Sequence, residues 1–240
     1  MKNKSFLLRS LFCLFLAISI ASVSAQRVEG NKNVVEQDRE HTGFTSIEIE
    51  RGVDLYLEQG NRTSVTVKAD ENLVDMIKTK VDGNTLKVTT TNKGIYNYES
   101  CAVHVVVKDL NQIIATGGSD IYGVNTIQQN ELRMRLTGGS DVEMELDLKT
   151  LHCKLTGGSD AEFKGQVNHM IVEARGGSDL EAKRLTVNKC ELDVRGGSDA
   201  HVHVKEELDA RATGASDIYY SGNPSVVHEK ARGSSDIHSN

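Results

Sequence analysis

The stretch Leu136–Asp160, LTGGSDVEMELDLKTLHCKLTGGSD, contains the letters TGGSD twice, once near its start and once at its end. Gly-Gly-Ser-Asp occurs five times in the chain, and two degenerate copies, Gly-Ala-Ser-Asp and Gly-Ser-Ser-Asp, follow. The spacings between successive aspartates are 21, 19, 19, 20, 18 and 19 residues. A near-constant period of this length is typical of a repeat architecture. The seven aspartates are Asp120, Asp141, Asp160, Asp179, Asp199, Asp217 and Asp236.

The residues around each copy alternate between apolar and polar. The residue after each Asp is apolar and the next is mostly polar. The second and fourth positions before the first Gly are apolar, with Glu229 as the exception, and the sixth position is apolar from the second copy on. Period two indicates strands with one buried face. Because corresponding positions share their character, we expect an all-β, parallel β-helix of about seven coils of 18–21 residues, preferably right-handed, with like residues stacked about 4.8 Å apart. The rival, an antiparallel propeller or prism, needs a hairpin turn in each repeat, for which 147–150 is poorly suited.

The repeated tetrapeptide predicts a sharp corner in each coil. Glycine adopts backbone angles that other residues resist, and Ser and Asp side chains hydrogen bond to turn backbone. The predicted structural turn residues are Gly117, Gly118, Gly138, Gly139, Gly157, Gly158, Gly176, Gly177, Gly196, Gly197, Gly214 and Gly233.

The aspartates have two alternative interpretations. Carboxylates stacked about 4.8 Å apart repel by about 1 kcal/mol per neighbouring pair even in water, so the seven aspartates could form a ladder of calcium ligands. They could also be the acids of a polysaccharide-cleaving enzyme, but a catalytic acid is paired with a second acid or base and is not repeated in every coil. We therefore expect turn residues, no catalytic residues, no metal site and no cofactor, with calcium as the one alternative cofactor.

Cysteines and histidines give no other site. Cys153 and Cys190 occupy inward positions two coils apart in different rows, beyond disulfide reach, so we expect buried thiols. His201 and His203 lie on one face of a strand, a pattern more typical of a solvated surface than of a metal pair.

The two ends of the chain differ from the repeats. Residues 1–25 have a basic start, an apolar run and small residues before position 26, which predicts a signal peptide rather than an uncleaved membrane anchor. We expect a mobile leader over 26–40 and one β-solenoid domain over 41–240. Its irregular part, 41–116, would cap the repeat coils of 117–240 and includes a short helix with Asp70 as its N-cap. The last coil is left open, which predicts self-association or contact with another envelope protein at that end.

Charge limits the partners. The chain has 28 basic and 34 acidic residues, a net charge of −6, which argues against nucleic acid and anionic lipid. After the signal peptide no stretch is apolar enough to span a membrane, so we do not expect an integral membrane protein. The outward strand faces are where a ligand would bind, although their mixed charges also suit an ordinary soluble β surface. The side chains concerned are Arg133, Arg135, His152, Lys154, Glu173, Glu191 and Asp193.

Four features together resemble the putative auto-transporter adhesin, head GIN domain family, which is common in Bacteroidetes. They are the signal peptide, the segment GFTSIEIERGVDLYLEQG at 43–60, the segment VKADENLVDMIKTKVDGNTLKV at 67–88, and the serial Gly-Gly-Ser-Asp repeats. The resemblance covers residues 40–240 and implies an exported β-solenoid with an adhesin role, without catalytic residues.

The sequence thus predicts an exported, non-enzymatic binding scaffold located in the periplasm, on the outer-membrane surface or outside the cell. Its ligand would be an unknown surface molecule or envelope protein. The alternative is a structural or stress-related envelope protein without an external ligand.

Overall fold

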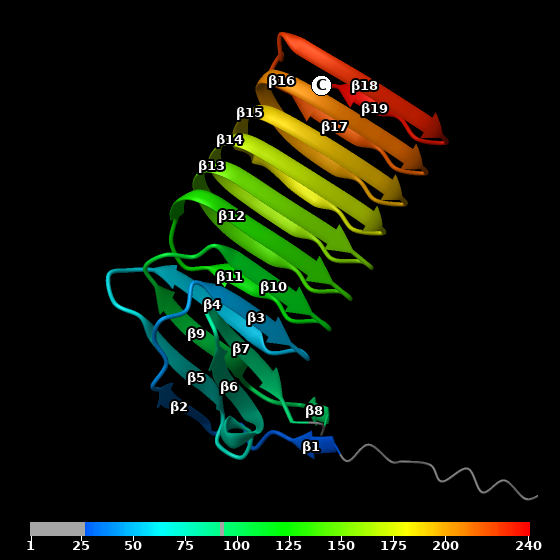
Figure 1. Cartoon of the computed structure of the whole chain (residues 1–240). Coiled ribbons are helices and arrows are strands. Elements are labelled where there is room, and N and C mark those ends of the chain that lie inside the picture. Colours follow the sequence, from blue (N-terminus) through cyan, green and yellow to red (C-terminus); the bar gives the residue numbers. More distant parts are fainter. Residues whose placement is uncertain (1–26, 92–93) are drawn as a thin grey trace, which may run out of the picture.

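A stack of parallel β coils, closed at one end by antiparallel strands, makes up the computed structural model, which describes residues 27–91 and 94–240 (Figure 1). The prediction of an all-β parallel solenoid with about seven coils is confirmed. The predicted signal peptide, 1–25, lies outside the described residues. The strands are β1 Arg27–Glu29, β2 Val34–Arg39, β3 Ser46–Glu50, β4 Asp54–Gln59, β5 Ser64–Asp70, β6 Ile77–Asp82, β7 Thr85–Thr90, β8 Gly94–Tyr96, β9 Cys101–Val107, β10 Gln112–Thr116, β11 Ile121–Gly123, β12 Ile127–Thr137, β13 Val142–Thr156, β14 Ala161–Gly176, β15 Leu180–Gly196, β16 Ala200–Gly214, β17 Ile218–Ser221, β18 Val226–Gly233 and β19 Ile237–Ser239.

Each coil of the repeat region has two flat sides joined by a bend and by the Gly-Gly-Ser-Asp corner. For example, β13 runs along the first side, bends, and returns along the second side to the next corner. We call the sides face A and face B. Face A consists of the segments after each corner, at 54–59, 101–107, 121–123, 142–148, 161–167, 180–187, 200–204, 218–221 and 237–239. Face B consists of the segments before each corner, at 46–50, 85–90, 112–116, 132–137, 151–156, 170–175, 190–195, 208–213 and 227–232.

The strand register places like positions of successive repeats next to one another. On face B, Met134 lies beside Cys153, Cys153 beside Val172, and Val172 beside Leu192. These inward side chains are at most 3% exposed and belong to one continuous core. Every pairing between successive repeats is parallel, which excludes the propeller and prism alternatives.

The first half of the chain builds coils in an order that differs from the sequence. The coil made by β3 and β4 pairs directly with β10 and β11 of the first Gly-Gly-Ser-Asp coil. The coil made by β7 and β9 follows it in the sequence but lies on its other side. Beyond that coil, β5 and β2 extend face A and β6 extends face B, all antiparallel to their neighbours. These three strands close the N-terminal end of the stack.

Two predictions about this half are wrong. The leader predicted over 26–40 contains β1 and β2, because β2 covers the edge of β5 and β1 pairs with β8. The helix with Asp70 as N-cap is only a single 3-10 turn at Val74–Met76, and Leu73 occupies its N-cap position. Asp70 instead ends strand β5, and its buried carboxylate serves neighbouring loops.

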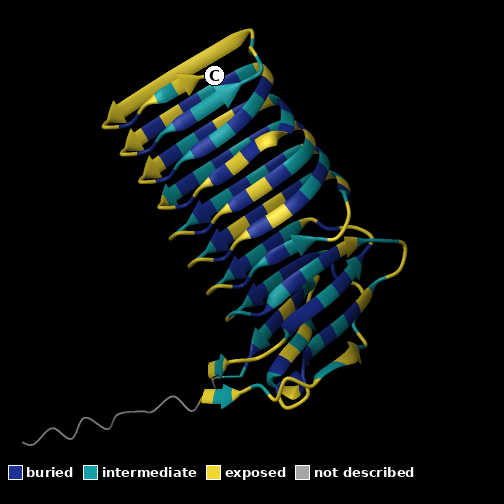
Figure 2. Cartoon of the chain, turned by 180° about the vertical axis from the view of Figure 1, so that it is seen from behind, coloured by how far each residue is buried: buried dark blue, intermediate teal, exposed yellow. Residues whose placement is uncertain are grey.

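The C-terminal end has no covering strands in the described chain. β18 pairs with β16 on one side, and all of its residues are exposed (Figure 2). One inward position of this last rung is Glu229, and the Tyr220 side chain hydrogen bonds with Glu229 and with Ser239. The other inward positions of this rung hold Val227, Ala231, Ile237 and Ser239, so polar and apolar side chains are mixed there, and Val227 is 38% exposed.

Candidate functional site

The corners are of two types, which differ at their second residue. In the first three Gly-Gly-Ser-Asp copies both glycines have positive φ, for example 74° at Gly138 and 75° at Gly139. In the last four copies only the first glycine has positive φ, and the second position holds Gly177, Gly197, Ala215 and Ser234. The degenerate copies therefore fall where the backbone does not require glycine at the second position.

The corner serines form a buried ladder that joins the coils. Each serine from the first to the sixth copy is fully buried, and its amide donates to the hydroxyl oxygen of the serine in the next coil over 3.0–3.4 Å. Ser159 and Ser178 also donate their hydroxyl hydrogens to a carbonyl in their own coil. The sequence analysis expected such side chains to hydrogen bond locally and missed the ladder.

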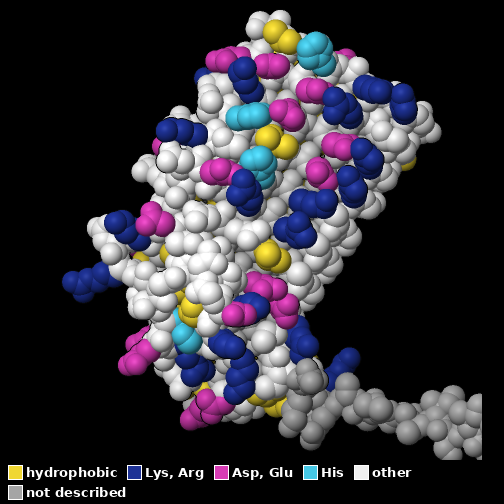
Figure 3. Space-filling view, in the orientation of Figure 1, with side chains coloured by type: hydrophobic (Ala, Val, Ile, Leu, Met, Phe, Trp, Pro, Cys, Tyr) yellow, Lys and Arg dark blue, Asp and Glu magenta, His cyan; other side chains and the backbone are white. Residues whose placement is uncertain are grey.

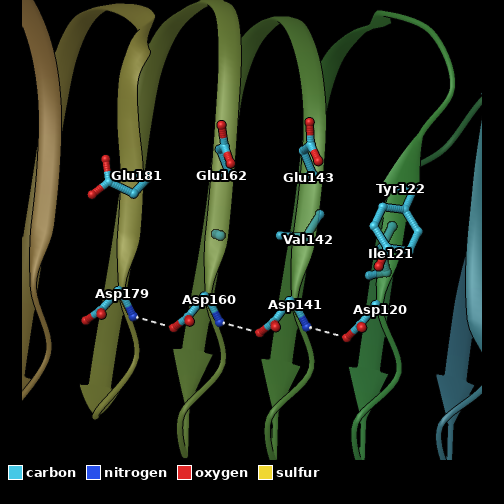
Figure 4. A pocket seen from close by; sticks show the side chains of 11 residues that line it. Asp120, Ile121, Tyr122, Asp141, Val142, Glu143, Asp160, Glu162, Asp179 and Glu181 are labelled. Carbon is cyan, nitrogen blue, oxygen red and sulfur yellow. Dashed lines mark hydrogen bonds between the residues drawn. The ribbon is translucent and has the colours of Figure 1, made fainter.

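The corner aspartates form a second ladder with the opposite direction (Figure 4). The Oδ1 atom of each aspartate accepts the amide hydrogen of the aspartate in the next coil, over 2.9–3.2 Å, from Asp120 to Asp217. The serine and aspartate ladders together link each coil to both of its neighbours.

An eighth corner extends the aspartate column toward the N-terminus. Arg51 and Gly52 have φ values of 65° and 70°, as the glycine pairs of the first copies do. The Gly52 amide donates to the Ser119 hydroxyl, and the Asp120 amide hydrogen bonds to Asp54. The sequence signal was present, because Ile47 and Ile49 precede this corner at the spacing found in the repeats.

The environment of the aspartates bears on the calcium and catalytic interpretations. Burial raises the pKa of Asp54 and Asp120, and the neighbouring carboxylate raises each further. Within residues 27–91 and 94–240, no three His, Cys, Asp or Glu side chains converge to hold a metal ion. The ladder of amide donors thus offsets part of the repulsion within the column.

A row of outward side chains on face A runs beside the aspartates. Its central members are Glu143, Glu162 and Glu181, which lie next to one another in register. Stacked aromatic rings flank them at both ends (Figure 4 shows the central part). The complete row is His104, Tyr56, Tyr122, Glu143, Glu162, Glu181, His201, Tyr219 and His238.

The acidic centre of this row lines a hollow of about 350 Å³ together with the aspartates. Cations of the chain itself neutralise part of it, since Glu162 pairs with Arg184 and Glu181 pairs with Lys183 at 3.4 Å. This hollow is therefore less acidic than its lining carboxylates alone suggest.

On face B a second hollow, of about 250 Å³, is lined by five side chains that the sequence analysis had singled out, Arg133, Arg135, His152, Lys154 and Glu173. Gln112 and Ile171 also line it. Figure 3 shows Lys and Arg side chains gathered along one edge of this face, with Asp and Glu between them. The structure thus brings Arg133, Arg135, His152 and Lys154 together, whereas Glu191 and Asp193 lie further along the stack.

The cysteines and histidines have structural environments. Cys153 and Cys190 are buried and free, as predicted, and burial raises the pKa of Cys153 to about 12. Cys101 is also a buried free thiol. His201 stacks on Tyr219 at 4.6 Å between ring centroids, and His203 contacts the Ser221 hydroxyl at 3.0 Å.

With this geometry the family can be stated. The chain belongs to the family described as putative auto-transporter adhesin, head GIN domain, whose model matches residues 43–224. Membership supports an adhesin-like role at the cell envelope. No curated protein sequence matches the chain.

Solved structures share the fold. A putative adhesin from Bacteroides fragilis is similar with a TM-score of 0.82 and 21% identity, covering 89% of this chain and 100% of that one. A putative adhesin from Parabacteroides merdae has a TM-score of 0.71 and 17% identity, with 90% and 100% coverage. A putative lipid binding protein from Parabacteroides distasonis has a TM-score of 0.67 and 21% identity, with 89% and 100% coverage. None of the helices in the described part of the chain has the length and apolarity needed to cross a membrane.

Proposed function

We propose that the protein is an exported, non-enzymatic binding scaffold, an adhesin of the cell envelope that presents its outer faces to a ligand. The observation that carries this proposal is the aspartate ladder. The most repeated acidic groups of the chain bond to the amides of neighbouring coils and so maintain the stack. The outward side chains vary along regular rows, an arrangement suited to contact with an extended surface.

The same ladder supports a structural role for the aspartates in place of calcium binding. One oxygen of each carboxylate from Asp120 to Asp217 is already committed to an amide hydrogen. Calcium prefers six to eight oxygen ligands, and a column with one remaining oxygen per coil offers few at any point.

The test is binding of the purified protein, residues 26–240, to an array of glycans and host-matrix proteins, once with calcium and once with a chelator. Binding of equal strength in both arms is expected. Loss of binding in the chelator, accompanied by a calcium-dependent rise in melting temperature, would assign the aspartates to a metal instead.

Absence of binding in both arms would contradict the adhesin proposal and favour the structural envelope protein. Exposure to externally added protease on intact producing cells provides an independent check, since an adhesin must be accessible from outside.

A further inference from the structure

Face B carries a cluster of basic side chains in the middle of the stack. We call Arg133, Arg135, His152, Lys154 and Arg175 the basic patch. Arg133 and Arg135 are exposed, and Lys154 and Arg175 keep 39% and 43% of their side-chain surface accessible. In a chain of net charge −6, this concentration of cations on three adjacent strands needs a physical reason.

The register of the patch places basic side chains side by side. Arg133 lies beside His152, and Arg135 lies beside Lys154. Adjacent cations in a sheet are destabilising. Further along the stack, opposite charges lie side by side instead, since Lys154 lies beside Glu173 and Asp193 lies beside Arg211.

Most of the cations have a carboxylate partner within the chain, but one does not. Arg133 and His152 share Glu131, and Lys154 and Arg175 share Glu173. Arg135 has no ion pair or hydrogen bond to any side chain in the described residues, and on its own row it follows Ile114. Glu131 and Glu173 thus serve three permanently charged cations and His152, and Arg135 is available to a ligand.

The hollow of about 250 Å³ brings Arg133, Arg135, His152 and Lys154 of the patch to one ligand-sized space. A guanidinium group binds a carboxylate or sulfate with two parallel hydrogen bonds, and Lys154 adds a second charge one rung, about 4.8 Å, along the stack. The two rows of the patch run along the solenoid axis, so successive anionic groups of one linear polymer can meet successive rungs.

We propose that the basic patch binds the sulfate or carboxylate groups of an anionic polysaccharide that lies along face B. This inference rests on the proposed adhesin function and names the ligand class of its binding surface. A polymer fits better than an anionic bilayer for two reasons. The exposed large apolar side chains, Tyr96, Tyr98, Val124, Val226 and Val227, lie elsewhere. An anionic bilayer is a broad surface that repels a protein of net negative charge, whereas a single anionic polymer contacts the protein only along the patch.

The test measures binding to heparin, to polygalacturonate, to neutral dextran and to vesicles containing phosphatidylglycerol. The patch variant is Arg133→Gln, Arg135→Gln, Lys154→Gln. The matched control is Lys183→Gln, Arg184→Gln, Lys189→Gln, which removes three exposed cations that are also ion-paired. Circular dichroism and melting temperature confirm that both variants are folded.

We expect the wild type to bind at least one of the two anionic polymers but not dextran, with an affinity that falls as salt increases. The patch variant should lose at least about tenfold in affinity, equal to about 1.4 kcal/mol, whereas the control stays within about twofold. Equal losses in both variants, or stronger binding to vesicles than to either polymer, would overturn the inference.

The outcomes separate this inference from the proposed function. If the protein binds another array ligand and the patch variant binds it equally well, the adhesin proposal is supported and the basic-patch inference is refuted. If the protein binds no array ligand and no anionic polymer, both the adhesin proposal and the basic-patch inference are refuted.

Discussion

The two ends of the solenoid stop the stack in different ways. At the N-terminal end, β5 and β2 extend face A and β6 extends face B, so additional backbone pairs with the outermost coil. At the C-terminal end, β18 and β19 are the last described strands. Their inward positions hold polar side chains, Glu229 and Ser239, as well as apolar ones, Val227, Ala231 and Ile237. Additional strands cover the N-terminal end, whereas at the C-terminal end the last described coil has an uncovered face.

Both ends also carry charge on their free strand edges. Lys78 and Lys80 point outward from β6, and Lys230 and Arg232 point outward from β18. Stacking of two copies head to tail on face B would bring these cations together, and charged edge residues are a known protection against such pairing. The two ends thus share charged edge strands on face B, but only the N-terminal end has additional strands over the core in the described residues. Self-association through the C-terminal end stays a prediction, and these charges oppose it.

The largest difference between the two ends should be the loss of stability when an aspartate at each end is replaced. Asp70 accepts amide hydrogens from Lys32, Glu99 and Ser100 over 2.8–3.1 Å and is fully buried. Asp70→Ala leaves these amide donors without an acceptor, so it should lower the free energy of unfolding by about 3 kcal/mol in urea denaturation. Asp236→Ala, in the last rung, should lower it by less than about 0.5 kcal/mol. Similar losses would mean that the cap does not depend on Asp70.

The pH dependence sharpens that prediction. Burial raises the pKa of Asp70, but hydrogen bonds from the Lys32, Ser100 and Glu99 amides outweigh it and leave the pKa below its usual 3.8. The ionised carboxylate therefore stabilises the fold above pH 3.8, and this contribution is lost as pH falls through the lower folded-state pKa. The difference in unfolding free energy between wild type and Asp70→Ala should shrink below pH 4, and a constant difference would contradict the assignment.

The next largest effect on stability should distinguish the two types of corner. Gly139 has a φ of 75°, so Gly139→Ala should lower the free energy of unfolding by about 1–2 kcal/mol. Gly197 has no positive φ, and the nearest atom to an added Cβ is the Gly176 carbonyl oxygen at 3.9 Å. Gly197→Ala should therefore be neutral or stabilise by about 0.5 kcal/mol. Paired melting curves decide, and equal destabilisation would show that the two corner types are not distinct in solution.

The edge charges can be removed at one end at a time. Lys230→Val with Arg232→Val should make β18 an uncharged edge and produce concentration-dependent association in sedimentation velocity experiments. Lys78→Val with Lys80→Val should do the same at β6. The variant Lys230→Gln with Arg232→Gln removes the charges without adding apolar side chains, so it shows whether loss of charge alone causes association. Monomeric behaviour of both valine variants at high concentration would show that the charges do not guard the edges.

The smallest expected effect concerns the aspartate column where the two halves meet. Burial raises the pKa of Asp120, and the nearby Asp141 carboxylate adds to the increase, so ionisation of Asp120 weakens the fold. Asp120→Asn keeps an oxygen acceptor for the Asp141 amide and removes the charge. It should raise the free energy of unfolding at pH 7 by less than about 1 kcal/mol, since solvent screens a half-exposed group.

The sign of that change is also testable. The folded state holds a proton on Asp120 more strongly than the unfolded state does, so wild-type stability should rise relative to Asp120→Asn as pH falls through the raised pKa. The advantage of Asp120→Asn should disappear near pH 4. A destabilised Asp120→Asn at pH 7 would instead show that the charge itself strengthens the ladder.

The sequence predicted the repeat coils well because each obeys the same local pattern. Columns such as Met134, Cys153 and Val172 follow from period two and a constant repeat length, and the outward cations of the basic patch follow from the same count. The corner at Arg51 escaped because Arg-Gly-Val-Asp shares few letters with Gly-Gly-Ser-Asp, although its flanking isoleucines keep the pattern.

The rest of the fold depends on contacts that no local pattern encodes. The coil of β7 and β9 lies on the far side of the coil of β3 and β4, an inversion of chain order that only long-range pairing determines. Asp70 has the signature of a helix cap, yet its donors come from Lys32 and Ser100, far away in the sequence. In the basic patch, the sequence could not show that Arg135 lacks a partner, because ion pairs depend on rotamers across neighbouring strands.

The opposed serine and aspartate ladders have a consequence for how such chains change in evolution. Each coil presents the same donor and acceptor atoms to the coil before it and to the coil after it. Loss of one entire coil, such as residues 157–175, would join two surfaces that already match, and duplication of a coil would do the same. An in-frame insertion or deletion of that size changes the length of the molecule by about 4.8 Å and leaves its ends intact. Reach and surface chemistry can therefore evolve independently of each other.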